Sequence, residues 1–180
     1  MLVAKQKRKE NIAEYILYLY QIEDMIRALR FDMNQIEMQL VPAYKADEKT
    51  SKEIADWYSN LLIMMEKEGV REKGHLQFLV NLIADVNDFH LKLMETATDA
   101  QYVRTFQMIA GLLGELRTKN PSAPNDIQLT IDTVYGFLLL KMKNAEVTVE
   151  TEEAVQRLSQ WLGSLSKLYR DFESGDFSFE

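Results

Sequence analysis

The sequence predicts an all-α protein, and three observations favour this fold class. The 180 residues contain seven glycines and three prolines, well below the average of about 7% and 5%, so the chain has few turn-forming residues. Apolar residues recur at spacings of three and four, which places them on one face of a helix. No segment alternates with period two strongly enough to predict a strand. Because the connections are short, we expect a compact antiparallel bundle of six to seven helices.

The first two predicted helices occupy the first 41 residues. One spans about 9–30, where a single apolar face is formed by Ile12, Tyr15, Ile16, Leu19, Ile22, Ile26 and Leu29. The next spans 32–41, with Asp32 as its N-cap. Pro42 ends it, because a proline pushes the residue before it out of the helical region.

The third and fourth helices lie before and after Gly69, which we expect at a helix C-terminus. The third begins at Thr50, which forms a capping-box pattern with Glu53. The fourth spans about 72–97, and its apolar residues leave only about a third of its circumference polar. We therefore expect this fourth helix to be the central one.

Three further helices complete the predicted bundle. Asp99 caps a helix that ends near 120, a second helix spans about 125–144, and Thr151 caps a helix that reaches Gly175. Gly111 and Gly114 fall inside the first of these, where we expect them to let a neighbouring helix approach closely. Residues 1–175 are predicted to form a single helical domain. Residues 176–180 form an acidic aromatic tail that either docks on a partner or folds back on the bundle.

Charge and composition exclude several classes of protein. The net charge of −7 argues against a nucleic-acid binder, which usually carries a basic surface. The absence of cysteine excludes disulfides and thiolate metal sites, and it fits a reducing compartment. No apolar run approaches the roughly 18 residues of a membrane span. Glu14 interrupts the apolar stretch after the basic N-terminus, so we expect an unprocessed, cytoplasmic protein without a signal peptide.

The basic N-terminus is one candidate contact surface, formed by Lys5, Lys7, Arg8 and Lys9. These residues are interpreted either as a solvated terminus or as a surface that touches phosphate groups.

The few residues able to carry chemistry are two histidines and their neighbours. Glu72 and His75 form Glu-x-x-His, a spacing that di-iron helical bundles use in pairs. Because the chain holds only one copy, it is a weak metal signal, and no cofactor is expected. No recognisable pair of nucleophile and base is present, which favours a protein that is not an enzyme.

His90 falls on the apolar arc of the fourth helix, with Asn87 on the same face. A buried polar group needs a partner, so His90 is either a hydrogen-bonded core residue or part of a pocket between helices. Glu23 is an acid on the apolar face of the first helix, and Arg27 follows at the favoured spacing of four. This pair predicts a salt bridge at the core edge, or a pocket shared with His90.

Several segments resemble domain-of-unknown-function family 4924. They are residues 7–15 (KRKENIAEY), 21–24 (QIED), 26–27 (IR), 56–58 (DWY) and 74–76 (GHL). The resemblance implies a compact, all-helical bacterial protein and brings no activity, ligand or catalytic residue.

The leading functional prediction is a non-enzymatic protein that binds another macromolecule or associates with itself as a homodimer. One alternative is a ligand- or metal-binding protein or enzyme with a pocket around His90. The other is a nucleic-acid accessory protein that uses its basic N-terminus.

Overall fold

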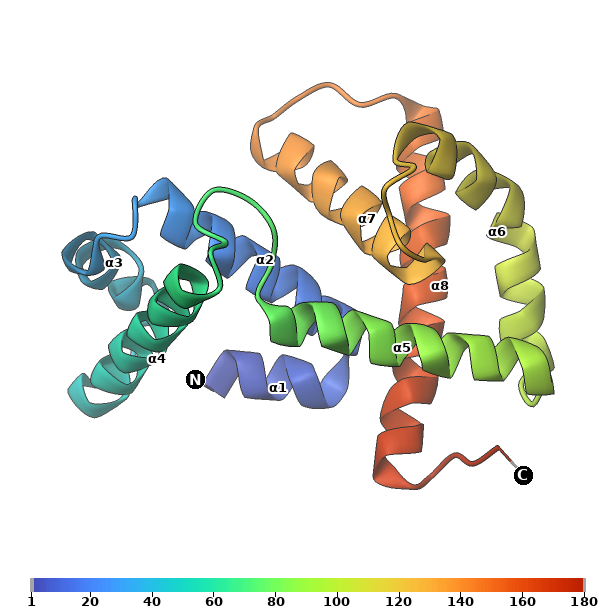
Figure 1. Ribbon diagram of the computed structural model, residues 1–180, viewed down its shortest axis with the longest axis horizontal. Helices are drawn as coiled ribbons and strands as arrows, with labels where there is room; N and C mark the ends of the chain where they lie inside the picture. The colour runs from blue at the N-terminus through green and yellow to red at the C-terminus, as the bar shows by residue number, and fades with distance from the viewer. Residues whose placement is uncertain (1, 180) are drawn as a thin grey trace. The chain divides into compact units, whose positions relative to one another are not determined.

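The computed structural model describes residues 2–179. Over this range it contains eight α-helices, one 3-10 helix and no β-strand, which confirms the predicted all-α class (Figure 1). The elements in chain order are α1 (Leu2–Glu10), α2 (Ile12–Ala28), α3 (Met33–Gln39), the 3-10 helix η1 (Val41–Tyr44), α4 (Glu48–Lys67), α5 (Gln77–Thr96), α6 (Ala100–Lys119), α7 (Asp126–Met142) and α8 (Val149–Ser174).

The chain forms two compact units. The first consists of Met1–Arg8 and Tyr15–Asn81, and the second of Lys9–Glu14 and Leu82–Glu180. The first unit therefore contains α3, η1 and α4 with most of α2, and the second contains α6, α7 and α8 with most of α5. The single domain predicted over residues 1–175 stays a prediction.

The helix predicted over 9–30 corresponds to α2, and a helix that was not predicted, α1, ends at Glu10 before the break at Asn11. The side-chain oxygen of Asn11 accepts a hydrogen bond from the backbone N–H of Glu14 at 3.1 Å. Asparagine favours such a position at a helix start, where its oxygen satisfies an amide that has no partner within the helix. The break adds one helix to the number expected.

The core of the first unit is built from regularly spaced apolar residues of α2 and α4. The buried members are Ile16, Leu19, Ile22 and Ile26 on α2, and Ile54, Tyr58, Leu61 and Met65 on α4. The hydroxyl of Tyr44 in η1 lies 2.9 Å from that of Tyr18 and 3.0 Å from that of Tyr58. These bonds join η1 to both helices.

Two predicted N-caps lie one turn too late. Asp47 caps α4 by accepting from the N–H of Thr50 at 2.8 Å. Thr148 caps α8 by accepting from the N–H of Thr151 at 3.3 Å. In both helices the predicted cap is instead the donor, three residues after the true cap.

The start predicted near residue 72 for the fourth helix was also wrong, since α5 begins at Gln77. Residues 71–74 are bends, and Gly74 has a φ of 87°, which a helix interior does not allow. Two carboxylates from elsewhere in the first unit satisfy the free amides at this start. Glu23 accepts from Leu76 N at 2.9 Å, and Glu68 accepts from Gln77 N at 2.6 Å.

In the second unit, α6, α7 and α8 pack against one another (Figure 1). Trp161, Leu158, Ile127 and Ile131 are completely buried at this packing. The buried face of α5 is narrower than its sequence predicts, because Val80 and Leu91 are 43% and 55% exposed. Among the described residues, no helix is long and apolar enough to cross a membrane.

Candidate functional site

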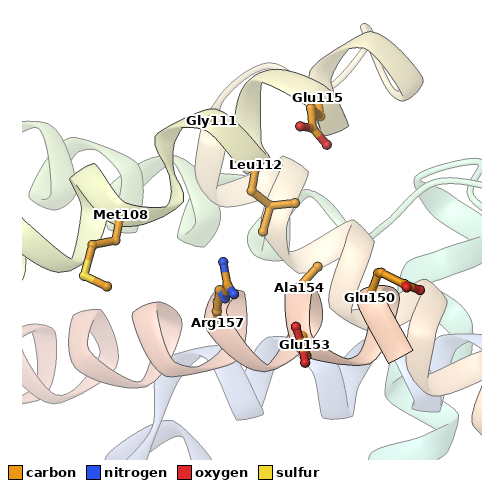
Figure 2. A pocket seen from close by; sticks show the side chains of 8 residues that line it. All are labelled: Met108, Gly111, Leu112, Glu115, Glu150, Glu153, Ala154 and Arg157. Atoms are coloured by element: carbon orange, nitrogen blue, oxygen red, sulfur yellow. The ribbon is translucent and has the colours of Figure 1, made fainter. Parts of the chain in front are cut away.

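A groove of about 410 Å³ lies between α6 and α8 in the second unit (Figure 2). Leu112 points from α6 toward α8, and Arg157 points from α8 toward α6. Each helix contributes four lining residues, which are Met108, Gly111, Leu112 and Glu115 on α6, and Glu150, Glu153, Ala154 and Arg157 on α8.

The α6 side of this groove includes one glycine, Gly111, and a second glycine, Gly114, follows it on the same helix. Gly111 and Gly114 are exposed, and no heavy atom lies within 4 Å of the position that a Cβ would take on either glycine. The expectation that these glycines make room for another helix of the same chain is therefore wrong for residues 2–179. Met108 on the same helix is 81% exposed. This part of α6 thus presents backbone and a flexible apolar side chain to solvent.

The charges along the groove are mostly negative. Its lining includes the carboxylates of Glu115, Glu150 and Glu153 and one guanidinium group, that of Arg157. Hydrogen bonds at the start of α8, from the backbone N–H of Glu150 and the Thr148 side chain, hold the pKa of Glu150 below its usual range. The groove is therefore negatively charged at neutral pH.

A separate buried cluster in the second unit surrounds His90, which is 3% exposed. Its Nδ1 lies 2.7 Å from the Tyr102 hydroxyl, and its ring contacts Phe106 and Trp161 at centroid distances of 4.8 and 5.4 Å. Burial lowers the pKa of His90, although the charge of Asp126 opposes this effect. Burial raises the pKa of Tyr102 far above its usual range, which the Trp161 N–H offsets slightly. We infer that the neutral Tyr102 donates its proton in the bond to neutral His90.

The buried indole N–H of Trp161 has no hydrogen-bond partner among the described residues. The indole lies near enough to Tyr102 to lower the pKa of its hydroxyl. The arrangement of the two groups does not meet the geometry of a hydrogen bond. Asn87 lies half-buried on α5. Neither His90 nor Asn87 lines the groove between α6 and α8.

Glu23 belongs to the first unit, whereas His90 belongs to the second. The Glu23 side chain is 1% exposed, and one of its oxygens lies 2.6 Å from His75 Nδ1. The His75 ring also stacks on Tyr20, with a centroid distance of 3.5 Å and an interplanar angle of 7°. Glu23 thus fixes the loop before α5.

The spacing of four residues predicted a salt bridge between Arg27 and Glu23, but Arg27 has other partners. Its guanidinium contacts Asp24 at 2.8 Å and donates to the backbone carbonyls of Val70 and Gly74. Arg27 therefore holds the same loop that Glu23 and His75 fix, from the next turn of α2. These contacts explain why α2 carries charged groups beside its apolar face.

Glu72 and His75 do not lie on a helix, so the spacing argument for a metal site loses its structural basis. Glu72 is exposed in the loop, and His75 is directed to Glu23. Within residues 2–179, no group of three or more His, Asp or Glu side chains is placed to hold a metal ion.

The basic residues of the N-terminus all lie on α1. Lys5 and Lys9 are exposed, while Lys7 and Arg8 are half-buried. The last two also take part in contacts of their own, so this helix offers two exposed ammonium groups rather than four free cations.

Sequence reasoning missed the groove between α6 and α8. Its clearest signal was Gly111, which falls inside a predicted helix and was interpreted as internal packing. Glu115 and Arg157 carried no pattern of their own. Only the packing of α6 against α8 brings these residues together.

Comparison with known proteins identifies a family but no activity. The family model DUF4924, described as a domain of unknown function, matches residues 1–176. No curated protein and no solved structure matches the chain.

Proposed function

Because the chain belongs to the DUF4924 family, whose description assigns no activity, we propose its function from its own geometry. The protein acts as a non-enzymatic binding protein, and its groove between α6 and α8 takes a basic, amphipathic helix of a protein partner. The observation that carries this proposal is Gly111, an exposed and uncrowded glycine that lines the groove.

The two glycines reduce the stability of α6 without serving the fold. A glycine inside a helix costs about 1 kcal/mol relative to alanine. Nothing within 4 Å would obstruct a Cβ at Gly111 or Gly114. A closely approaching partner helix supplies a reason for Gly111, since it would meet bare backbone at this point of the groove.

The lining residues of the groove indicate which side chains a partner helix would need to fit it. Met108, Leu112 and Ala154 provide apolar contacts, and methionine adapts its shape to different side chains. The carboxylates of Glu115, Glu150 and Glu153 favour lysine or arginine beside the partner's apolar residues. A partner helix with one apolar stripe and basic flanks satisfies both requirements.

A homodimer through this groove is less favourable on charge. A two-fold contact places the same surface on both sides, so three carboxylates and Arg157 from one copy would face the same set from the other. We therefore propose a partner of opposite charge, and the homodimer becomes an outcome of the test.

The test uses a synthetic helical peptide with leucines on one face and lysines on its flanks. Fluorescence anisotropy should show saturable binding that weakens with salt, because surface charges are screened. The variant Gly111→Leu should abolish binding by filling the groove. The matched variant Ala110→Leu, on an exposed position of α6 outside the groove lining, should bind like the wild type.

Two results would overturn the proposal. One is equal binding of a control peptide in which glutamate replaces every lysine. The other is a concentration-dependent dimer in light scattering that Gly111→Leu abolishes, since the occupant would then be a second copy.

The other expectations from the sequence remain part of this proposal. The absence of cysteine supports a cytoplasmic location, and we retain the expected bacterial origin. The net charge of −7 disfavours nucleic acid as the partner. A pocket around His90 is the weaker functional alternative, because the Tyr102 bond and the surrounding rings account for its burial.

A further inference from the structure

Phe89 of α5 is the centre of a second cluster of aromatic side chains, away from the groove between α6 and α8. The centroid of its ring lies 5.3 Å from the ring centroid of Tyr169 and 5.1 Å from that of Phe172, both on α8. It lies 6.2 Å from Phe177 and 5.4 Å from Phe179, which follow the end of α8. The aromatic tail thus lies on the second unit, to which all these residues belong.

These rings border a hollow of about 320 Å³. Its lining consists of Asp85, Asp88, Phe89 and Lys92 of α5, together with Tyr169, Phe172 and Phe179. The volume is at the lower end of the range of roughly 300–1,000 Å³ for small-molecule sites. The hollow therefore suits a small ligand that prefers aromatic walls.

The charged groups of this hollow indicate the sign of such a ligand. Lys92 Nζ stands 4.5 Å from the centre of the Phe179 ring, so a ring face already receives a cation. Asp88 lies four residues before Lys92, yet no hydrogen bond or ion pair engages Asp85 or Asp88 among the described residues. Two unpaired carboxylates and a ring face that already holds an ammonium group together favour a positively charged ligand.

We propose that this hollow binds the trimethylammonium group of a small organic cation. The ring faces attract such a group through their negative quadrupole. The group needs no hydrogen-bond acceptors, and Asp85 and Asp88 add a favourable potential without direct contact. On binding, the Lys92 ammonium leaves the Phe179 ring and moves into solvent, where it is well hydrated.

The test titrates the purified protein with choline and follows the aromatic proton signals by NMR. Saturable shifts should be confined to the cluster. The neutral carbon analogue 3,3-dimethylbutan-1-ol has the same shape without the charge, and it should bind at least about tenfold more weakly if cation–π attraction dominates. Equal binding of the analogue and choline would overturn the proposal.

Variants distinguish the site from general binding. Phe179→Leu and Asp88→Asn should each weaken choline binding by about threefold or more, while Lys92→Met should strengthen it by removing the competing ammonium. Phe137→Leu is the matched control, because Lys141 stands over that ring at 5.4 Å outside the hollow. An unchanged affinity in all three test variants, or a loss equal to theirs in the control, would refute the site.

A final arm identifies the source of the group. A short peptide containing trimethyllysine, compared with its unmodified form, tests whether the cation is carried by a protein rather than by a free compound. Tighter binding of the methylated peptide than of choline assigns the peptide, and the reverse order assigns the free compound. Failure of both probes would overturn the proposal without affecting the separate groove between α6 and α8.

Discussion

His75 Nδ1 lies 2.6 Å from Glu23 Oε2, while Glu23 Oε1 accepts from the backbone N–H of Leu76 at 2.9 Å. One buried carboxylate on α2 therefore forms hydrogen bonds both with a side chain and with the free backbone amide at the start of α5. This relationship explains why an acid occupies the apolar face of α2, and it leads to the first prediction.

Replacing Glu23 with alanine should lower the free energy of unfolding by about 3 kcal/mol, because it removes two hydrogen bonds to a charged acceptor and leaves a buried N–H unpaired. Urea unfolding followed by circular dichroism measures this loss. Glu68→Ala is the comparison, since Glu68 caps the same helix start from an exposed position. An equal loss in both variants would contradict the role given to the buried carboxylate.

Stability should depend on pH through His90. Burial lowers the pKa of His90 in the folded state, whereas in the unfolded state the group titrates near its ordinary value of about 6.5. The unfolded state therefore binds the proton first as the pH falls, so stability is lost from about pH 6.5 down to the folded-state pKa.

The variant His90→Gln isolates this effect from that of the carboxylates. Unfolding free energies measured between pH 5 and 8 should fall less steeply below about pH 6.5 in the variant than in the wild type. Parallel curves for the two proteins would show that His90 does not titrate differently on folding. The charge of Asp126 opposes the lowering of the His90 pKa, so it reduces the pH effect expected in the wild type.

Alanine at Gly111 or Gly114 should stabilise the chain by up to about 1 kcal/mol each, because alanine has the higher helix propensity and a Cβ meets nothing within 4 Å. Thermal unfolding measures the gain. Gly163→Ala on α8 is the control with an equally uncrowded Cβ. All three should gain stability, but only alanine at Gly111, which lines the groove, should weaken binding of the basic peptide. Destabilisation by Gly111→Ala would show a contact that the fold depends on.

Asp99 connects a helix cap to the buried His90 cluster. Its carboxylate accepts from the N–H of Tyr102 at 2.7 Å, and the hydroxyl of the same tyrosine bonds His90. Asp99→Ala should therefore cost about 1 kcal/mol as a lost N-cap. Asp99→Asn should retain most of this stability, because asparagine caps equally well. A loss as large in the asparagine variant would indicate a role for the charge instead of the cap.

Helix existence was predictable because it depends on local spacing. The apolar repeat of α2, the caps at Asp32 and Asp99 and the helix start near residue 125 agree with the structure. Gly175, with a φ of 82°, ends α8 as predicted. The exact starts were less predictable, since Thr50 and Thr151 resemble caps while donating to the residues that perform this role.

The sequence by itself determined the all-α class, most helix positions, the family resemblance and the importance of His90 and Glu23 as polar groups on apolar faces. Each of these depends on residues within a few turns of one another, where helical periodicity decides which side chains share a face. Only the tertiary structure decided which residues from distant parts of the chain contact one another. His75 meets Glu23 across 52 residues of chain, and the groove joins α6 to α8. No local spacing encodes such contacts, because they arise when separate helices bury their apolar faces together.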